Sequence, residues 1–145
     1  MGKKEKTLIR VVLDTNILVS ALLYKGELAM FHSLWKEKRI LPLFSRCTFR
    51  EFTRVLSYPK FELARDEIAF LLREEVLPYF EVVEIRKPIE GICEDPDDDV
   101  FISCAVYGKA SYLVTGDAKL LAVSRYANVK MVRAAEFLRL TAKGS

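Results

Sequence analysis

The chain has only one histidine, His32, and three cysteines among its 145 residues. His32 lies in a helical pattern beside Trp35, which predicts a packing or surface role and leaves no Ser-His-Asp triad. Cys47, Cys93 and Cys104 are far apart and form no CxxC pair, so we expect reduced, mostly buried thiols and no zinc site. Any chemistry must therefore be carried by carboxylates, lysines or hydroxyls.

Long apolar runs are also missing. The longest stretches, such as 17–23, are too short to span a membrane, and no apolar segment follows the charged start, so we expect no secretory signal and a cytoplasmic location. Hydrophobic residues make up 51% and charged residues 30%, which favours one globular domain over 1–145, with 1–7 and 142–145 as frayed tails. The net charge of +3 permits a nucleic-acid partner without requiring one.

Apolar runs and helical patterns alternate along the chain. Strands are predicted at 9–13, 40–44, 80–85, 111–114 and 129–132. Helices are predicted at 15–24, 27–39, 47–56, 65–76, 98–107, 118–123 and 134–140. Pro42 would suit a strand at the sheet edge. The alternation predicts an α/β fold with a parallel sheet covered on both faces, where sites form at the carboxyl ends of the strands.

Carboxylates occur at four places that this fold would bring together. Asp14 follows the first strand directly, and Asp117 follows the fourth strand after a short turn. Glu51 is the only acid of the helix at 47–56. The loop and first turn before the fourth strand hold a further group: Asp95, Asp97, Asp98 and Asp99. Four separate segments can thus deliver acids to one end of one sheet.

Each acid taken alone has an ordinary structural explanation. Asp14 could form an Asx turn or cap a helix, and Asp117 could cap the helix at 118–123. The acids at 97–99 suit a helix N-terminus, and Glu51 could pair with Arg54 on a solvated face. The functional interpretation therefore rests on their convergence. Like charges gathered in one cleft raise each other's pKa, and a hard cation such as Mg²⁺ or Mn²⁺ relieves that repulsion.

Four ordered motifs resemble those of PIN domains. They are VVLDTNI at 11–17, FREF at 49–52, DPDDDVFISCA at 95–105 and LVTGD at 113–117. The resemblance implies a three-layer α/β/α sandwich with a central five-stranded parallel sheet. It also implies a metal-dependent endoribonuclease that uses Mg²⁺ or Mn²⁺.

By this resemblance, the metal-site acids are Asp14, Glu51, Asp98 and Asp117. Asp98 stands three residues before Phe101, which is the family's spacing, but the acid Asp99 follows it, and the choice between the two stays open. The expected supporting residues, which would orient a carboxylate or a bound water, are Thr15, Asn16, Asp95, Asp99 and Thr115.

Many PIN domains of this size are toxins of toxin-antitoxin pairs, so the resemblance also implies a homodimer and an antitoxin that blocks the acidic cleft. Cations near the motifs are candidates for the RNA backbone, with ordinary surface charge as the alternative: Arg46, Arg50, Arg54 and Lys119. Three other functions are weighed. A non-catalytic PIN scaffold remains open, a structure-specific DNA nuclease is usually longer, and a receiver-like domain would need a paired acid early in the chain.

Overall fold

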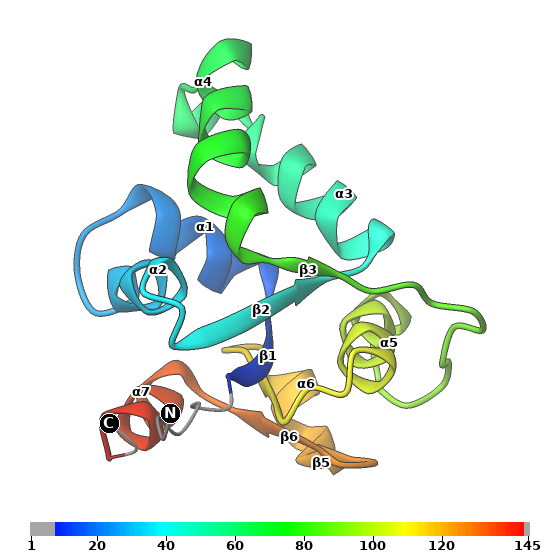
Figure 1. Ribbon diagram of the computed structural model, residues 1–145. Helices are drawn as coiled ribbons and strands as arrows, with labels where there is room; N and C mark the ends of the chain where they lie inside the picture. The colour runs from blue at the N-terminus through cyan, green and yellow to red at the C-terminus, as the bar shows by residue number, and fades with distance from the viewer. Residues whose placement is uncertain (1–7, 144–145) are drawn as a thin grey trace, which may run out of the picture.

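Short apolar runs form the centre of the fold, a mixed and mostly parallel sheet (Figure 1). The computed structural model describes residues 8–143. The strands lie in the order β3-β2-β1-β4-β6-β5. Their bounds are β1 Ile9–Leu13, β2 Ile40–Phe44, β3 Glu81–Val82, β4 Tyr112–Val114, β5 Arg125–Tyr126 and β6 Val129–Val132. The α/β fold and the five predicted strands, parallel to one another, are confirmed.

The expectation of a five-stranded, all-parallel sheet is wrong at one edge. A sixth strand, β5, pairs antiparallel with β6 through a two-residue turn. Ala127 adopts a positive φ of 53° in that turn, and the Ala-Asn pair lacks the Asn-Gly signature from which a tight hairpin is usually predicted. The placement of Pro42 at a sheet edge is also wrong, since β2 lies between β3 and β1. The proline is tolerated because β3 pairs only with Leu43 and Phe44, beyond it.

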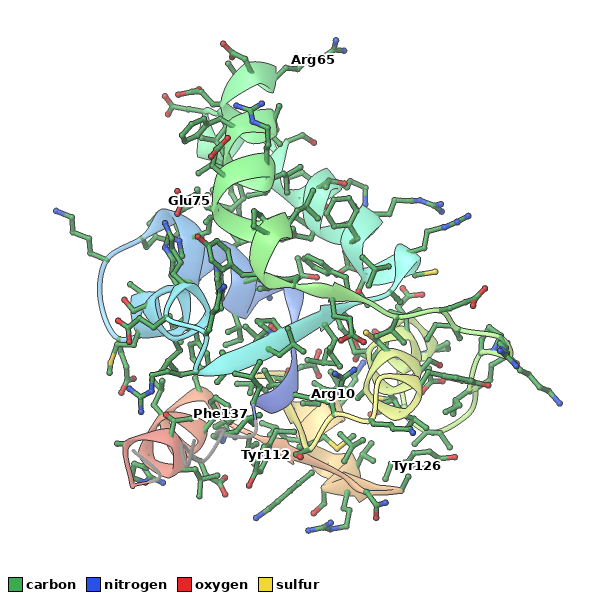
Figure 2. All side chains as sticks on the ribbon, viewed as in Figure 1. Arg10, Arg65, Glu75, Tyr112, Tyr126 and Phe137 are labelled. Atoms are coloured by element: carbon green, nitrogen blue, oxygen red, sulfur yellow. The ribbon has the colours of Figure 1, made fainter. Side chains whose placement is uncertain are left out.

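Helices occur in all seven predicted regions. They are α1 Thr15–Leu23, α2 Ala29–Lys36, α3 Arg46–Leu56, α4 Arg65–Phe70, α5 Asp99–Tyr107, α6 Ala118–Val123 and α7 Ala134–Lys143. α3 begins with a capping box in which Ser45 and Thr48 each satisfy the other's backbone N–H. α4 carries Arg65 at its far end and projects away from the sheet (Figures 1 and 2).

The predicted helix at 65–76 changes its winding halfway. α4 continues as a π-helical segment, η2 (Leu71–Val76), in which Glu75 turns toward α2. The Glu75 carbonyl accepts a hydrogen bond of 2.8 Å from Trp35 Nε1, and its Oε1 lies 2.9 Å from both His32 Nε2 and Lys36 Nζ (Figure 2). These contacts fix η2 against α2. They also agree with the packing role expected for His32.

Residues alternate between two cores along each central strand. Val11 and Leu13 face one core, together with α1, α2, α3 and the Phe137 side of α7. Val12 and Leu113 face the other core, which α5 and α6 cover. The chain therefore forms the expected layers of helix, sheet and helix. Among residues 8–143, no helix is long and apolar enough to cross a membrane.

Candidate active site

The carboxyl ends of β1 and β4 open onto a cleft of about 390 Å³. The two strands are neighbours, but the helices that follow them lie on opposite faces of the sheet: α1 in one core and α6 in the other. This is a topological switch point, where parallel sheets usually bind their ligands. The four acids expected from the sequence all line the cleft: Asp14, Glu51, Asp98 and Asp117.

Asp14 is the most enclosed of the four, with 8% of its surface exposed. It is the N-cap of α1, where Oδ1 accepts a 3.0 Å hydrogen bond from the backbone N–H of Ile17. Its Oδ2 accepts from the hydroxyl of the buried Thr115. Burial raises the pKa of Asp14 and the charge of Asp117 adds to the rise, while these hydrogen bonds oppose it. Asp14 is thus a helix cap and a cleft acid at once.

Thr115 connects the acids of two motifs. Its hydroxyl donates to Asp14 and accepts a 2.9 Å hydrogen bond from the backbone N–H of Asp117. Asp117 in turn caps α6 by accepting from the backbone N–H of Lys119 at 2.7 Å. A buried hydroxyl that is satisfied on both sides holds its neighbours in one geometry.

Glu51 reaches the cleft from α3 and is held by a residue of α1. The hydroxyl of Thr15 donates a 2.7 Å hydrogen bond to Glu51 Oε2. Val55, one turn further along α3, lines the same wall of the cleft. The predicted alternative, an ion pair between Glu51 and Arg54, is absent among the residues that the structure describes, because Arg54 bonds the hydroxyl of Tyr58 instead.

The two adjacent acids at 98 and 99 have different environments. Asp98 lines the cleft, where burial, then the charges of Asp117, Asp95 and Asp14, raise its pKa to about 6. Asp99 is only 4% exposed and faces the preceding loop. Its oxygens accept hydrogen bonds from the backbone N–H groups of Gly91 at 2.9 Å and Cys93 at 2.8 Å. The geometry therefore favours Asp98 as the cleft acid, with Asp99 organising the loop.

The remaining expected residues lie at and beyond the rim. Asn16 is exposed and lines the cleft, whereas Asp95 caps a short turn by accepting from Asp97 N–H at 3.0 Å and acts on Asp98 through its charge. None of the four candidate cations lines the cleft, and all are exposed: Arg46, Arg50, Arg54 and Lys119. Arg46 lines a separate groove beside β3.

Several cleft residues were not among those singled out in the sequence. Ser20 and Val55 form part of its walls, and both could have been found from helical spacing, one turn after Asn16 and Glu51. Leu28 also lines the cleft; it is the residue before α2, whereas the sequence predicts it inside the helix at 27–39. The Cys93 thiol lies 3.8 Å from Asp98 Oδ2. As predicted, the cysteines are free; Cys93 and Cys104 are buried, while Cys47 is exposed.

The donor chemistry of the cleft fits a hard divalent cation. Its charged side chains are all carboxylates, and their mutual repulsion and burial make ionisation of Asp98 and Asp14 unfavourable without a cation. Within residues 8–143, no group of three or more His, Cys, Asp or Glu side chains is placed so that together they could hold a metal ion. An open arrangement suits Mg²⁺, which commonly binds through one or two carboxylates and keeps several waters.

A family model and one curated relative match most of the chain. The family model described as the PIN domain matches residues 10–119, a span that contains all four cleft acids. The uncharacterized protein MJ1680 of Methanocaldococcus jannaschii is 30% identical over 127 residues, which cover 85% of this chain and 80% of that protein.

Two solved structures share the fold. PAE2754 from Pyrobaculum aerophilum superposes with a TM-score of 0.57 at 19% identity, covering 94% of this chain and 90% of its own. FitAcB from Neisseria gonorrhoeae superposes with a TM-score of 0.58 at 14% identity, covering 86% of this chain and 98% of its own. At such low identities the likeness concerns the fold alone.

Proposed function

This chain belongs to the PIN domain family, whose members are typically metal-dependent nucleases, and from that premise we propose that it is a divalent-metal-dependent endoribonuclease. The cleft at the ends of β1 and β4 would be its active site. The observation that carries the proposal is the convergence of acids from four separate segments on that cleft. Burial there, followed by the charges of Asp117, Asp95 and Asp14, raises the pKa of Asp98 to about 6. Such a cluster is unfavourable for folding alone and favourable for holding a cation.

We assign Asp14 and Asp98 to hold Mg²⁺ or Mn²⁺, with Glu51 and Asp117 completing the acid set. When bound, the ion supplies charge neutralisation and a lowered pKa for water. Thr115 would fix the orientation of Asp14.

We assign Glu51 to take a proton from the attacking water. Its Oε2 is occupied by the Thr15 hydroxyl, and its Oε1 forms no hydrogen bond among the residues that the structure describes. A side chain fixed through one oxygen and free at the other is positioned for general base catalysis. Attack of that water on phosphorus would break the bond to the leaving oxygen of the RNA chain.

PIN domains often act as toxins, and we extend the proposal to that role. The chain would then be the toxin of a toxin-antitoxin pair, a homodimer silenced by an antitoxin that covers the acidic cleft. Induced expression should arrest growth of a bacterial host, and the Asp14→Asn variant should relieve the arrest.

The direct test of the nuclease is cleavage of labelled RNAs and single-stranded DNA by the purified protein, with Mn²⁺ or Mg²⁺ and with EDTA. We expect metal-dependent cutting of RNA that Asp14→Asn abolishes. Asp66→Asn removes an exposed carboxylate of α4 outside the cleft and should cut like the wild type. Cutting of DNA alone would favour a DNA nuclease. Identical traces from wild type and Asp14→Asn would favour a scaffold that binds without cutting.

A further inference from the structure

Two exposed tyrosines lie where the walls of the cleft continue outward. On α1, Ser20 lines the cleft and Tyr24 follows one turn later as the C-cap, with 54% of its surface exposed. On α3, Val55 lines the cleft, and its carbonyl accepts a 3.0 Å hydrogen bond from the backbone N–H of Tyr58, which is 37% exposed. α1 and α3 pack against each other (Figure 1), so the two tyrosines follow cleft-lining residues on two contacting helices.

Cations and a third aromatic ring join these tyrosines into one surface. The Phe61 ring lies 6.4 Å from that of Tyr24, and Lys60 Nζ lies 5.2 Å from the Phe61 ring centre. The Arg54 guanidinium carbon lies 5.9 Å from the Tyr58 ring centre, and Arg54 Nη1 donates a 2.7 Å hydrogen bond to the Tyr58 hydroxyl. We call these five residues the aromatic platform: Tyr24, Arg54, Tyr58, Lys60 and Phe61.

The charges of the aromatic platform are not neutralised by the protein. Within residues 8–143, neither Arg54 nor Lys60 forms an ion pair with a carboxylate. Four lysines and arginines of residues 8–143 form ion pairs, among them Arg10 with Glu81 at 2.8 Å and Lys36 with Glu75 at 2.9 Å, and the others share the unpaired state of Arg54 and Lys60. Unpaired cations beside exposed aromatic faces provide both contacts that an unpaired nucleotide needs, one for its phosphate and one for its base.

We propose that the aromatic platform binds unpaired nucleotides of an RNA strand whose phosphodiester lies in the acidic cleft. Bases would stack on Tyr24 and Tyr58, while Arg54 and Lys60 contact the backbone. The acidic cleft repels an RNA strand, so binding energy has to come from outside it, and the platform is continuous with its walls. A duplex, whose bases are already stacked on one another, would not use it. The inference rests on the proposed function, because it assigns the strand to the same site.

Binding of short fluorescent RNA, measured by anisotropy in an Asp14→Asn background with Mg²⁺, tests the platform without cutting the probe. The probes are one single-stranded RNA, the same RNA annealed to its complement, and a version with abasic positions. Tyr24→Leu with Tyr58→Leu removes the stacking faces, and Tyr58→Phe keeps the ring. Tyr107→Leu is the matched control, because Tyr107 is a similarly exposed tyrosine at the end of α5 away from the cleft.

We expect the double leucine variant to bind single-stranded RNA at least roughly thirty-fold more weakly, as is typical when two base-stacking contacts are lost. Tyr58→Phe and Tyr107→Leu should bind like the parent. The abasic and duplex probes should bind weakly and be insensitive to the leucines. Circular dichroism and thermal unfolding check that each variant is folded.

The proposed platform is wrong if the parent and the double leucine variant bind single-stranded RNA with equal affinity. It is also wrong if the parent does not bind single-stranded RNA. Cleavage by the protein with intact tyrosines is scored separately. If the protein cuts RNA but the double leucine variant binds RNA as well as the parent does, the proposed platform is wrong and the proposed nuclease activity is supported. If binding depends on the tyrosines but nothing is cut, the nuclease is wrong and the platform stands.

Discussion

The Thr15 hydroxyl of α1 donates a 2.7 Å hydrogen bond to Oε2 of Glu51 in α3. The two residues are 36 positions apart, yet this bond selects one orientation for a carboxylate that would otherwise rotate freely at the cleft wall. Thr15 is buried, so its hydroxyl is shielded from competing water. The contact makes Thr15 a positioning residue, provided that Glu51 works as proposed.

Replacing Thr15 by valine should therefore lower kcat about ten-fold while leaving the fold intact, as is typical when the partner of an active-site ligand is lost. Valine has nearly the same shape but cannot donate. Thr15→Ser retains the hydroxyl and should restore most of the rate, so a serine variant as slow as the valine variant would count against positioning. RNA cleavage kinetics and thermal unfolding of both variants make the comparison.

The raised pKa of Asp98 makes stability depend on pH in the metal-free protein. Its usual value is 3.8 and its folded value is about 6, so between these limits the folded state holds a proton that the unfolded state has lost. Stability should therefore fall as pH rises from about 4 to 6 and then level off. Denaturant unfolding of wild type and Asp98→Asn isolates this residue. The wild type should lose stability relative to the variant over that range.

Binding of a divalent metal should change with pH in the opposite direction to the stability of the metal-free protein. A bound ion requires Asp98 to be ionised, so protons compete with it, and the affinity for Mn²⁺ should decrease below a pH of about 6. Calorimetric titration with Mn²⁺ at several pH values measures this. Asp98→Asn should remove both the affinity and its pH dependence, and an unchanged titration in that variant would exclude Asp98 as a metal ligand.

Replacing Asp99 should lower the stability of the protein and leave metal binding unchanged, unlike replacing Asp98. Its two hydrogen bonds to the backbone N–H groups of Gly91 and Cys93 are largely shielded from water. Asparagine has one acceptor oxygen, so Asp99→Asn leaves one N–H unsatisfied, and we expect a loss of about 1–3 kcal/mol in unfolding free energy. Mn²⁺ affinity of the folded variant should stay near the wild-type value. Loss of metal binding at full stability would instead identify Asp99 as the third acid.

Much of the site could be predicted because it depends on local position. Asp14 and Asp117 follow buried strands, and in a parallel sheet the carboxyl ends of neighbouring strands meet at one edge. Thr115, inside the turn between β4 and Asp117, is fixed by the same rule. The fold followed likewise from apolar runs alternating with helical patterns. The strand β5 could not be predicted in this way, because a strand of two residues has no periodicity in its sequence.

The choice between Asp98 and Asp99 could not be made from sequence. The two residues stand where a 3₁₀ turn passes into α5, and which of them faces the cleft depends on how the loop at 89–93 docks. The candidate cations lie outside the cleft for a related reason. On α3, the cleft receives Glu51 and Val55, one turn apart, whereas Arg50 is offset by about 100° around the helix. A residue that is close to a motif in the sequence need not lie close to the cleft in the structure.

Gly108 provides the last prediction, a test of packing away from the cleft. It ends α5 with an ordinary φ of −86°, so its role is steric and does not depend on glycine's backbone freedom. An added Cβ would lie 2.5 Å from Leu43 Cδ1 and 2.9 Å from both the Cys104 carbonyl oxygen and Val83 Cγ2. The backbone oxygen cannot move without shifting the helix.

Gly108→Ala should therefore cost about 1–3 kcal/mol of unfolding free energy, as overpacking of a filled core usually does. Gly116→Ala is the matched control, because its added methyl would meet no atom within 4 Å. Denaturant unfolding of both variants should show a loss for Gly108→Ala alone. Equal stability of the two would mean that α5 can shift away from β2 and β3. Because α5 also carries Asp98 at its other end, that shift should then appear as reduced RNA cleavage.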